Sequence, residues 1–320
     1  MPNKLIKNKT IDVCCVGIVC ADILAKPVNK LPERGKLKFA EQFTMEIGGC
    51  ASNAAIDLAK LSVKTGLITL TGDDAFGRMI KDGCASCGVD VSAVRSMNNV
   101  NTSASFVAID GGGERSIVHY KGANAVFSYK DVDMGYVKRA EYLFVAGTFL
   151  MPSFDGEDCG RVLKEAKAAG VICCMDTAWD AAGKWLDTIK NNLQYLDWFM
   201  PSFDEAKAMC GTGDYVKMAE TFKSFGVRNV IIKLGSEGAY VSSKDNDNFL
   251  SPAFKCNAMD ASGAGDSFCA GFLMGLVKGW DLRKCARFAN AVGYHCVQSI
   301  GTTTGIKSFE QIQRFLEDSD

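Results

Sequence analysis

The sequence has little histidine: two residues, His119 and His295, in a chain of 320. Zinc sites and histidine-based redox sites need several histidine or cysteine ligands at set spacings. One C-x-x-C pair, Cys84 to Cys87, is present, and no second pair stands at ligand spacing from it. These counts argue against a zinc or redox module.

The chain also lacks an excess of charge of either sign. Lysine and arginine total 36, against 37 for aspartate and glutamate, which gives a net charge of −1. A nearly neutral protein offers no general electrostatic attraction to nucleic acid or to an anionic membrane surface. We therefore expect neither as a partner, and a phosphate group would have to be bound by a local arrangement of residues.

Long apolar runs are missing as well. The polar and basic stretch 1–10 is followed by an apolar run, Val13 to Val19, that is too short for a membrane span or a signal peptide. The fourteen cysteines lie among apolar neighbours, as in Cys14-Cys15. We expect them to be reduced thiols in the core of a cytoplasmic protein.

Two common nucleotide-binding motifs are absent. The first apolar run, residues 15–19, lacks the G-x-G-x-x-G turn of dinucleotide-binding enzymes. The chain also contains no G-x-x-x-x-G-K-[ST] phosphate loop. If the protein handles a phosphate group, it must therefore do so through a motif other than these two.

What the sequence does contain is an alternation of apolar, β-branched runs with helical patterns. This alternation predicts an α/β fold in which helices cover both faces of a mostly parallel sheet. The carboxyl ends of the strands would then meet at one edge, where ligands usually bind. Strands are expected at 11–19, 65–71, 142–146, 171–176, 198–201 and 230–234, and helices at 52–60, 160–169, 204–210 and 215–225.

Two segments depart from this alternation. Residues 101–110 and 114–121 have strand-like composition and are joined by Gly111-Gly112-Gly113, which predicts a β-hairpin. The segment 24–45 lacks a helical period and could add strands beside that hairpin. We expect one domain over residues 1–320, with a small β-sheet lid formed by inserted segments of about 24–46 and 100–121.

The segment Asp260-Ala261-Ser262-Gly263-Ala264-Gly265-Asp266 carries the clearest sign of chemistry. Small residues let backbone amides approach an anion, and a helix that begins here would direct its free N–H groups and its dipole at that anion. Asp266 would lie in the first turn and could take the proton of an attacking hydroxyl. By itself, the same stretch also fits a tightly packed helix start with Asp266 as an N-terminal charge.

A second glycine pair, Gly48-Gly49, leads into another predicted helix, which carries Asn53. Bare glycines would let substrate hydroxyls come close, and the Asn53 amide can both donate hydrogen bonds to them and accept from them. Taken alone, this motif is equally well explained as a helix cap followed by an asparagine within the helix.

Together, the two motifs resemble the ribokinase (PfkB) family of carbohydrate kinases. The resemblance spans nearly the whole chain, from Asp22 after the first strand through G-G-x-x-x-N at 48–53 and Gly122-Ala123-Asn124 to D-x-x-G-A-G-D at 260–266. It implies a ribokinase-like three-layer sandwich with a small β-sheet lid. It also implies that the protein uses ATP and Mg²⁺ to phosphorylate an alcohol of a sugar-like substrate.

The resemblance assigns roles to individual residues. The last Asp of the late motif is the family's catalytic base and the amides before it form the anion hole. These roles fall here on Asp266 and on Gly263, Ala264 and Gly265. The implied sugar ligands are Asp22, Gly48, Gly49 and Asn53; the implied nucleotide contacts are Lys233, Gly235, Ser236, Gly238 and Asn290; and Glu205 would organise Mg²⁺ through water.

Two positions depart from the family pattern. Ser202 replaces the asparagine of an N-x-x-E element that ends in Glu205, so Glu205 could be only a helix N-terminal charge. Ala261 replaces the usual threonine between Asp260 and Ser262, whose positions help hold a monovalent cation in many members. We therefore expect at most a modest effect of potassium.

The hairpin adds two residues of interest. Arg115 and His119 share a face by period-two spacing, and Arg115 could meet a carboxylate or phosphate if the lid closes, whereas His119 also fits a solvated or packing role. In many family members two lids pack together, so a homodimer is expected. The apolar residues that could form this contact are Phe39, Phe43, Phe106 and Val118.

The identity of the substrate stays open at this point. The family that the sequence resembles accepts nucleosides, ribose, fructose-like ketoses, their phosphates and keto-deoxy acids. A sugar is favoured over a nucleoside because the lid segments resemble those of bacterial-type sugar kinases. A nucleoside kinase of the same family is the nearest alternative. A non-catalytic sugar sensor on this fold is the alternative from another class, against which the presence of Asp266 counts.

Overall fold

The computed structural model describes residues 9–112 and 114–319. Most of the polar stretch 1–10, the third glycine of the predicted hairpin tip and the last residue of the predicted domain 1–320 therefore lie outside the described residues.

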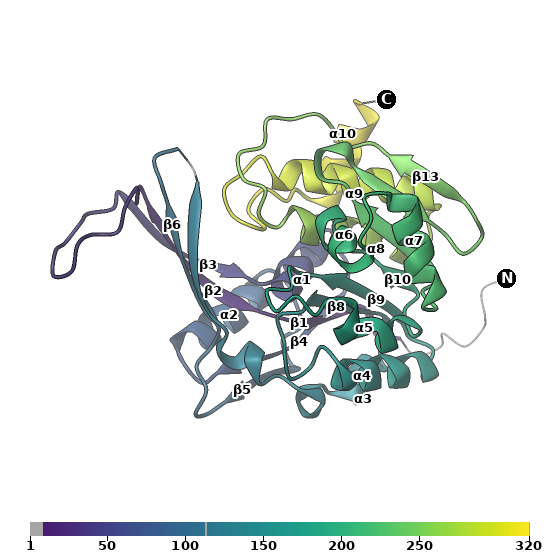
Figure 1. Cartoon of the computed structure of the whole chain (residues 1–320), viewed down its shortest axis with the longest axis horizontal. Coiled ribbons are helices and arrows are strands. Elements are labelled where there is room, and N and C mark those ends of the chain that lie inside the picture. The colour runs from purple at the N-terminus through teal and green to yellow at the C-terminus, as the bar shows by residue number, and fades with distance from the viewer. Residues whose placement is uncertain (1–8, 113, 320) are drawn as a thin grey trace.

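A nine-stranded sheet runs through the middle of the molecule (Figure 1). Its strand order is β13-β12-β11-β10-β9-β8-β1-β4-β5. The strands from β11 to β5 are parallel to their neighbours, whereas β12 pairs antiparallel with both β11 and β13. The strands are β1 (Ile11–Gly17), β4 (Thr65–Gly72), β5 (Val94–Met97), β8 (Ala140–Thr148), β9 (Ile172–Thr177), β10 (Trp198–Phe199), β11 (Asn229–Lys233), β12 (Ala239–Ser242) and β13 (Asn248–Ser251).

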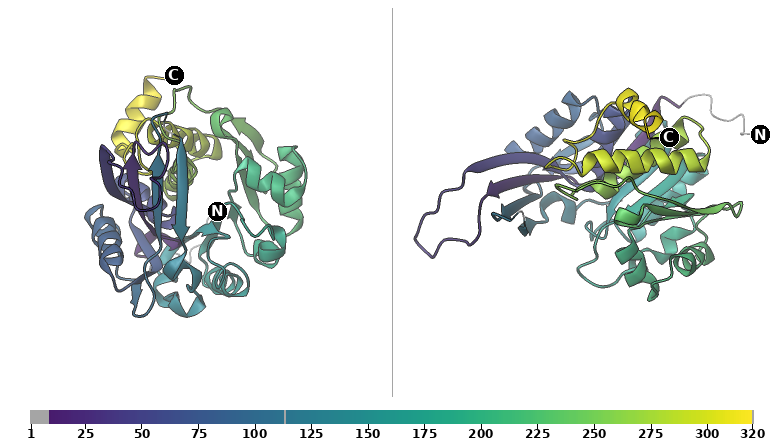
Figure 2. Two further views of the ribbon diagram at one scale, coloured as in Figure 1. Left: turned by 60° about the vertical axis from the view of Figure 1, so that its left-hand side comes forward. Right: turned by 90° about the horizontal axis from the view of Figure 1, so that it is seen from above.

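Helices cover both faces of this sheet and complete a three-layer arrangement (Figures 1 and 2). One face carries α1 (Cys50–Lys60), α2 (Ala75–Ser86), α8 (Ala264–Val277), α9 (Leu282–Cys296) and α10 (Phe309–Glu317). The other carries α3 (Met134–Val137), α4 (Glu157–Ala168), α5 (Leu186–Leu193), α6 (Phe203–Cys210) and α7 (Tyr215–Ser224).

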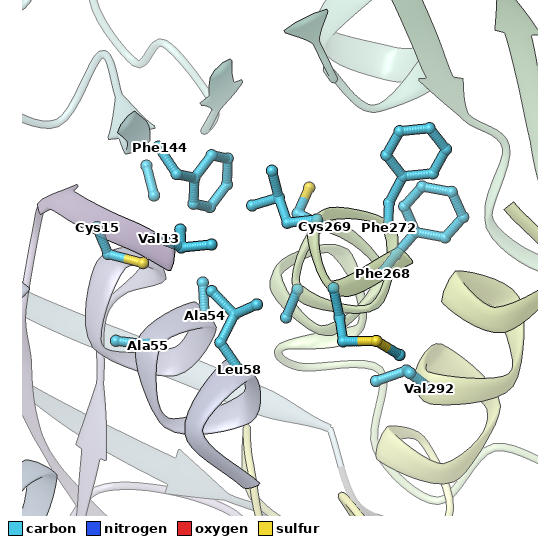
Figure 3. Packing of buried hydrophobic residues seen from close by; sticks show 14 of the residues in the cluster. Val13, Cys15, Ala54, Ala55, Leu58, Phe144, Phe268, Cys269, Phe272 and Val292 are labelled. Carbon is cyan, nitrogen blue, oxygen red and sulfur yellow. The ribbon is translucent and has the colours of Figure 1, made fainter. Parts of the chain in front are cut away.

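Strand β1 shows why the sheet is central. Val13 and Cys15 face the core under α1 and α8, whereas Cys14 and Val16 face the opposite core. A strand buried on both faces has no solvent side, and its sequence is correspondingly apolar throughout. Figure 3 shows the first of these cores, in which small α1 residues such as Ala54 let the helix pack close to the strand.

Helix α8 lies deep in the same core. Ten of its fourteen residues are buried, and Phe268 and Phe272 point between the sheet and α9 (Figure 3). Among the residues that the structure describes, no helix has both the length and the apolar character needed to cross a membrane. Every cysteine among the described residues is a free thiol.

A separate four-stranded sheet, called the small sheet below, projects from one side of the molecule (Figures 1 and 2). Its order is β3-β2-β6-β7, with β2 and β6 parallel and the other pairs antiparallel. Its strands are β2 (Cys20–Lys26), β3 (Gln42–Gly48), β6 (Ala104–Ile109) and β7 (Arg115–Tyr120).

The junction between the two sheets differs from the sequence prediction. The predicted strand 11–19 ends at Gly17, and β2 begins at Cys20 in the small sheet. Asn124 fixes this transition because its side chain bonds both backbone groups of Val19: Nδ2 donates to the carbonyl oxygen at 2.9 Å, and Oδ1 accepts from the amide at 3.4 Å. A continuous apolar run could not reveal that the chain changes sheets within it.

Candidate active site

The amino ends of α1 and α8 meet through one buried hydrogen bond. Asn53 Nδ2 donates to Asp266 Oδ2 at 2.8 Å, although the two residues are 213 positions apart in sequence. Asn53 Oδ1 accepts from the hydroxyl of Thr302 at 2.9 Å. The Asn53 amide is therefore fixed in orientation, and the second hydrogen on Nδ2 is left for another acceptor.

The environment of Asp266 suits a proton acceptor. Burial raises the pKa of this carboxyl above its ordinary value, while the hydrogen bond from Asn53 and the positive charge of Lys233 act in the opposite direction. A carboxylate with a raised pKa binds a proton more strongly than an exposed one and remains a base near neutral pH. Burial and a raised pKa are what a proton acceptor at this place would need, and the catalytic role of Asp266 stays a prediction.

The turn that leads into α8 can hold an anion. Gly263 precedes the helix with φ 78°, and a Cβ there would lie 2.4 Å from the carbonyl oxygen of Thr302. No side chain caps this helix end, so the first-turn amides face outward with the positive end of the helix dipole. The amide of Ala264 makes a 3.3 Å bond to the carbonyl of Ala261, which leaves the Gly265 and Asp266 amides as the freest donors.

Lys233 adds a full positive charge to this turn. A Cβ at Gly265 would lie 3.2 Å from Lys233 Nζ, so the ammonium group is beside the predicted anion hole. The same Nζ contacts both carboxylate oxygens of Asp176 at 2.7 Å. Burial by itself lowers the pKa of Lys233, but the charge of Asp176 outweighs this and keeps the amine protonated.

The predicted nucleotide loop follows β11. Gly235, with φ 60°, begins a short 3-10 turn over 235–237, and a Cβ there would meet nothing within 4 Å. Ser236 is exposed. At Gly238 a Cβ would lie 2.0 Å from the Ser251 carbonyl oxygen, so close strand packing requires glycine there. The loop is therefore open on the Gly235 side only.

Asn290 lies next to this loop, but its side-chain amide donates hydrogen bonds to other groups of the protein. Its Nδ2 donates to the carbonyl and hydroxyl oxygens of Ser251, at 3.1 and 3.0 Å, and to the carbonyl of Pro252 at 3.2 Å. These bonds attach α9 to the end of β13. A nucleotide contact by Asn290 would have to use its amide oxygen or its apolar stem.

Glu205 is part of a helix cap. Its Oε2 accepts from the amide of Ser202 and from the hydroxyl of Thr177, both at 2.9 Å, while Ser202 Oγ accepts from the Glu205 amide at 3.4 Å. Ser202 is thus the N-cap of α6 and forms a capping box with Glu205. Within residues 9–112 and 114–319, no group of three or more acidic, histidine or cysteine side chains is arranged to hold a metal ion.

Asp22 and the two early glycines form one packed unit. A Cβ at Gly48 would lie 2.0 Å from Asp22 Oδ2, and one at Gly49 would lie 2.6 Å from the Cα of Val19. The backbone of Val19 therefore requires glycine at position 49, and the Asp22 carboxylate fills the space beside Gly48. Asp22, Ser105 and His119 are direct cross-strand neighbours on one face of the small sheet.

The start of the late motif meets the small sheet. Arg115 on β7 pairs with the carboxylate of Asp260, and its NH1 donates to Ser262 Oγ at 2.6 Å. The two predicted cation ligands thus both contact a guanidinium. Beside them lies a cavity of about 560 Å³, lined on the small-sheet side by Leu24, Lys26 and other residues of β2, β3, β6 and β7.

The comparisons with known proteins decide the family. Residues 10–308 match the pfkB family of carbohydrate kinases. The chain belongs to this family. The family and the enzyme class expected from the two glycine motifs are thereby confirmed.

Relatives of this pfkB-family chain match most of its length. The 5-dehydro-2-deoxygluconokinase of Geobacillus kaustophilus is 27% identical over 329 residues, covering 97% of this chain and 95% of the relative. The 2-dehydro-3-deoxygluconokinase of Bacillus subtilis is 27% identical and covers 89% of this chain and 90% of its own.

Solved structures confirm the ribokinase-like fold. Arabidopsis thaliana ribokinase, complexed with ribose and ATP, is 26% identical with a TM-score of 0.82, covering 96% of this chain and 99% of that one. Thermotoga maritima ribokinase is 25% identical with the same TM-score and the same coverage.

Some residues around Asp266 were not singled out from the sequence. Thr302 orients Asn53, and Cys50 lies within hydrogen-bonding reach of Asp266. Asp57, one turn along α1 from Asn53, accepts at Oδ2 a 2.6 Å hydrogen bond from the hydroxyl of Ser267, the residue after Asp266, and both residues are fully buried. The run Gly301-Thr302-Thr303-Thr304-Gly305, between α9 and α10, was a signal for Thr302, because hydroxyl residues flanked by glycines are typical of a turn.

The pair of Lys233 and Asp176 generates a stability prediction. Lys233→Met leaves the Asp176 carboxylate buried without its partner, so the free energy of unfolding should fall by about 3–5 kcal/mol. The double variant Lys233→Met, Asp176→Leu should recover most of this loss because neither charge is then buried. Urea unfolding at pH 7 measures both values.

A surface pair supplies the matched control. Lys190 contacts Asp187 at 2.8 Å on the exposed side of α5, and Lys190→Met should leave the unfolding midpoint nearly unchanged. Equal losses for Lys233→Met and for the double variant would contradict the assignment of a buried ion pair.

Proposed function

We propose that this protein transfers the γ-phosphate of ATP to a hydroxyl of a sugar acid of the 5-dehydro-2-deoxygluconate type. The observation that carries the proposal is Asp266: a buried carboxylate with a raised pKa, in the first turn of α8 and held by Asn53. The names of the relatives support the substrate class, because they include kinases of two keto-deoxy sugar acids.

The proposed reaction takes place at the amino end of α8. Asp266 takes the proton as the sugar hydroxyl attacks the γ-phosphorus, the bond from that phosphorus to the β,γ-bridging oxygen breaks, and ADP leaves. The amides that begin α8 and the ammonium of Lys233 stabilise the charge on the transferred phosphoryl group, and both are in place before reaction. Mg²⁺ would neutralise charge on the ATP phosphates, with Glu205 acting through water because its Oε2 already accepts two hydrogen bonds.

ATP would lie along the open side of Gly235 and Ser236, where a side chain at position 235 would meet no atom of the protein. Gly238 and Asn290 would shape this region indirectly, through β13. This arrangement directs the phosphates toward Lys233 at the end of β11.

The small sheet would act as the lid. Asp22, Ser105 and His119 form a continuous polar row across β2, β6 and β7, and Ser105 Oγ is 3.1 Å from His119 Nδ1. With Gly48, Gly49 and Asn53 at its base, this row would bind the sugar hydroxyls. Closing the lid would exclude water, which otherwise competes with the sugar for the phosphoryl group.

The opposite face of the small sheet would form a homodimer. Ile23, Phe106 and Val118 are neighbours in one cross-strand row, and Phe43 and Val118 are exposed. An apolar sheet face on a projecting element is unfavourable in water unless a second surface covers it. Two copies of the same face meeting about a two-fold axis would cover both.

The free thiols agree with a cytoplasmic protein.

The central test is a substrate panel. ADP release with ATP and Mg²⁺ should occur with a keto-deoxy sugar acid and fall by about 10²–10⁴-fold in Asp266→Asn, which keeps the shape of the side chain but cannot accept the proton. Turnover only with a nucleoside would establish the nucleoside kinase instead. Sugar binding without turnover on any member of the panel would establish a sensor.

The pH dependence of kcat should report Asp266. Because the base works only when deprotonated, kcat should rise with pH through a midpoint above the ordinary aspartate range. Asn53→Ala removes a bond that favours the carboxylate, so the pKa of Asp266 should rise and the midpoint should move to higher pH. A midpoint that is unmoved in Asn53→Ala would contradict this role of the hydrogen bond.

The dimer is tested by sedimentation at micromolar concentration. The wild-type chain should sediment as a dimer, and the double variant Phe43→Lys, Val118→Lys as a monomer, because four lysines would be buried at the two-fold interface. Leu250→Lys, on the exposed edge of the large sheet, is the control and should remain dimeric. A monomeric wild type would refute the interface.

A further inference from the structure

A guanidinium group from the small sheet is bound at the start of the late motif. Arg115, on β7, reaches across to the loop before α8, where it pairs with Asp260 and donates to the hydroxyl of Ser262. The Asp260 side chain is buried, with 4% exposed, and that of Arg115 is mostly covered at 26%. This ion pair joins segments 145 residues apart and is shielded from solvent.

The remaining bonds to Asp260 complete its coordination by the protein. Its Oδ2 also accepts from the amide of Gly301, and its Oδ1 accepts from the amide of Ser262, both at 2.9 Å. Burial raises the pKa of Asp260, but these amides and the charge of Arg115 outweigh burial and lower it. The carboxylate is therefore ionised, and one fixed cation already balances its charge.

These contacts do not fit the monovalent cation that the family resemblance implies at Asp260 and Ser262. A potassium ion would need the carboxylate and hydroxyl oxygens that Arg115 contacts, and its positive charge would be repelled by the guanidinium at this distance. The cation and the Arg115 side chain exclude each other at this place.

We propose that the guanidinium of Arg115 replaces the monovalent cation and makes this kinase independent of potassium. Arg115 acts here as a positioning residue, because it touches the loop that forms the anion hole and not the reacting atoms. The inference rests on the proposed function for its activity readout only.

The connection from Arg115 to the anion hole is short. Asp260 and Ser262 directly precede Gly263, whose left-handed backbone begins α8. Gly301 holds the other side of Asp260, and the next residue, Thr302, packs on Gly263 and donates to Asn53. Removing the guanidinium of Arg115 therefore loosens the two segments that border Gly263, at 260–262 and 301–302. A displacement of about 1 Å there lowers catalysis strongly.

Because Arg115 is carried by the small sheet, its charge reaches the loop only while that sheet lies against the large domain. A free potassium ion has no such dependence. The fixed cation thus couples closure of the lid over the sugar to the shape of the anion hole, which would keep the hole incomplete when the lid is open.

The activity test compares KCl with the same concentration of tetramethylammonium chloride, whose cation is too large for the site. Wild-type kcat should differ by less than about twofold between the salts, as screening alone predicts. Arg115→Ala should lose about tenfold or more in tetramethylammonium and regain at least about threefold in KCl, because a small cation can now bind at Asp260. Arg115→Lys, which keeps a fixed charge, should not respond to potassium.

Arg34 provides the matched control, as an exposed arginine on the loop between β2 and β3. Arg34→Ala should behave as wild type in both salts. Strong activation of the wild type by KCl, or an Arg115→Ala variant that potassium does not restore, would overturn the proposal while leaving the kinase assignment intact.

A second readout does not depend on turnover. The thermal unfolding midpoint of Arg115→Ala should be higher in KCl than in tetramethylammonium chloride, because an ion that binds only the folded state stabilises it. The wild-type midpoint should be equal in the two salts. Selective stabilisation of the wild type by potassium would refute the proposal, even if no sugar of the panel is phosphorylated or if Arg115→Ala does not fold.

Discussion

The proposed active site depends on one buried hydrogen bond, from Asn53 on α1 to Asp266 on α8. Both helices enter the core at their amino ends through glycines whose missing side chains are replaced by neighbouring backbone. The bond brings an amide and a carboxylate from the two ends of the sequence into contact at a distance that packing alone would not specify. Thr302 completes the arrangement by holding the other end of the Asn53 amide.

Burial gives these few polar contacts their strength. Asp266, Asp176 and Lys233 lie where the effective dielectric constant is low, so each charge acts strongly on its neighbours. Burial raises the pKa of Asp266, and Asn53 and Lys233 limit that rise. The same ammonium group also lies beside the first-turn amides of α8, so one residue limits the pKa of Asp266 and adds charge to the proposed anion hole.

Much of the fold was predictable because strands buried on both faces leave unmistakable apolar runs. The runs at 65–71 and 142–146 correspond to β4 and β8, and the helix predicted at 204–210 begins one residue earlier as α6. The change of sheet at Val19 was not predictable, because it depends on an Asn124 side chain that is distant in sequence. Local patterns do not contain such pairings.

The candidate site was predicted only in part, because local motifs are visible in a sequence and tertiary contacts are not. Asp266 and Asn53 stand in motifs with a local physical meaning, and the structure brings them into contact. The hydrogen bonds from Asn290 to the end of β13 and the ion pair of Arg115 with Asp260 arise from tertiary packing. The spacing of residues in the sequence does not predict such contacts. The role of Gly48 and Gly49 in substrate binding stays a prediction; the structure shows that neighbouring backbone already accounts for the glycine at position 49.

The most direct test of this account is a double-variant cycle on kcat with Asn53→Ala and Asp266→Asn. If Asn53 acts by holding the catalytic base, Asn53→Ala should lower kcat in the wild-type background and lower it no further once Asp266 is asparagine, because residues that act as a unit are not additive. Losses that multiply in the double variant would show that the two residues contribute independently, and would contradict the account.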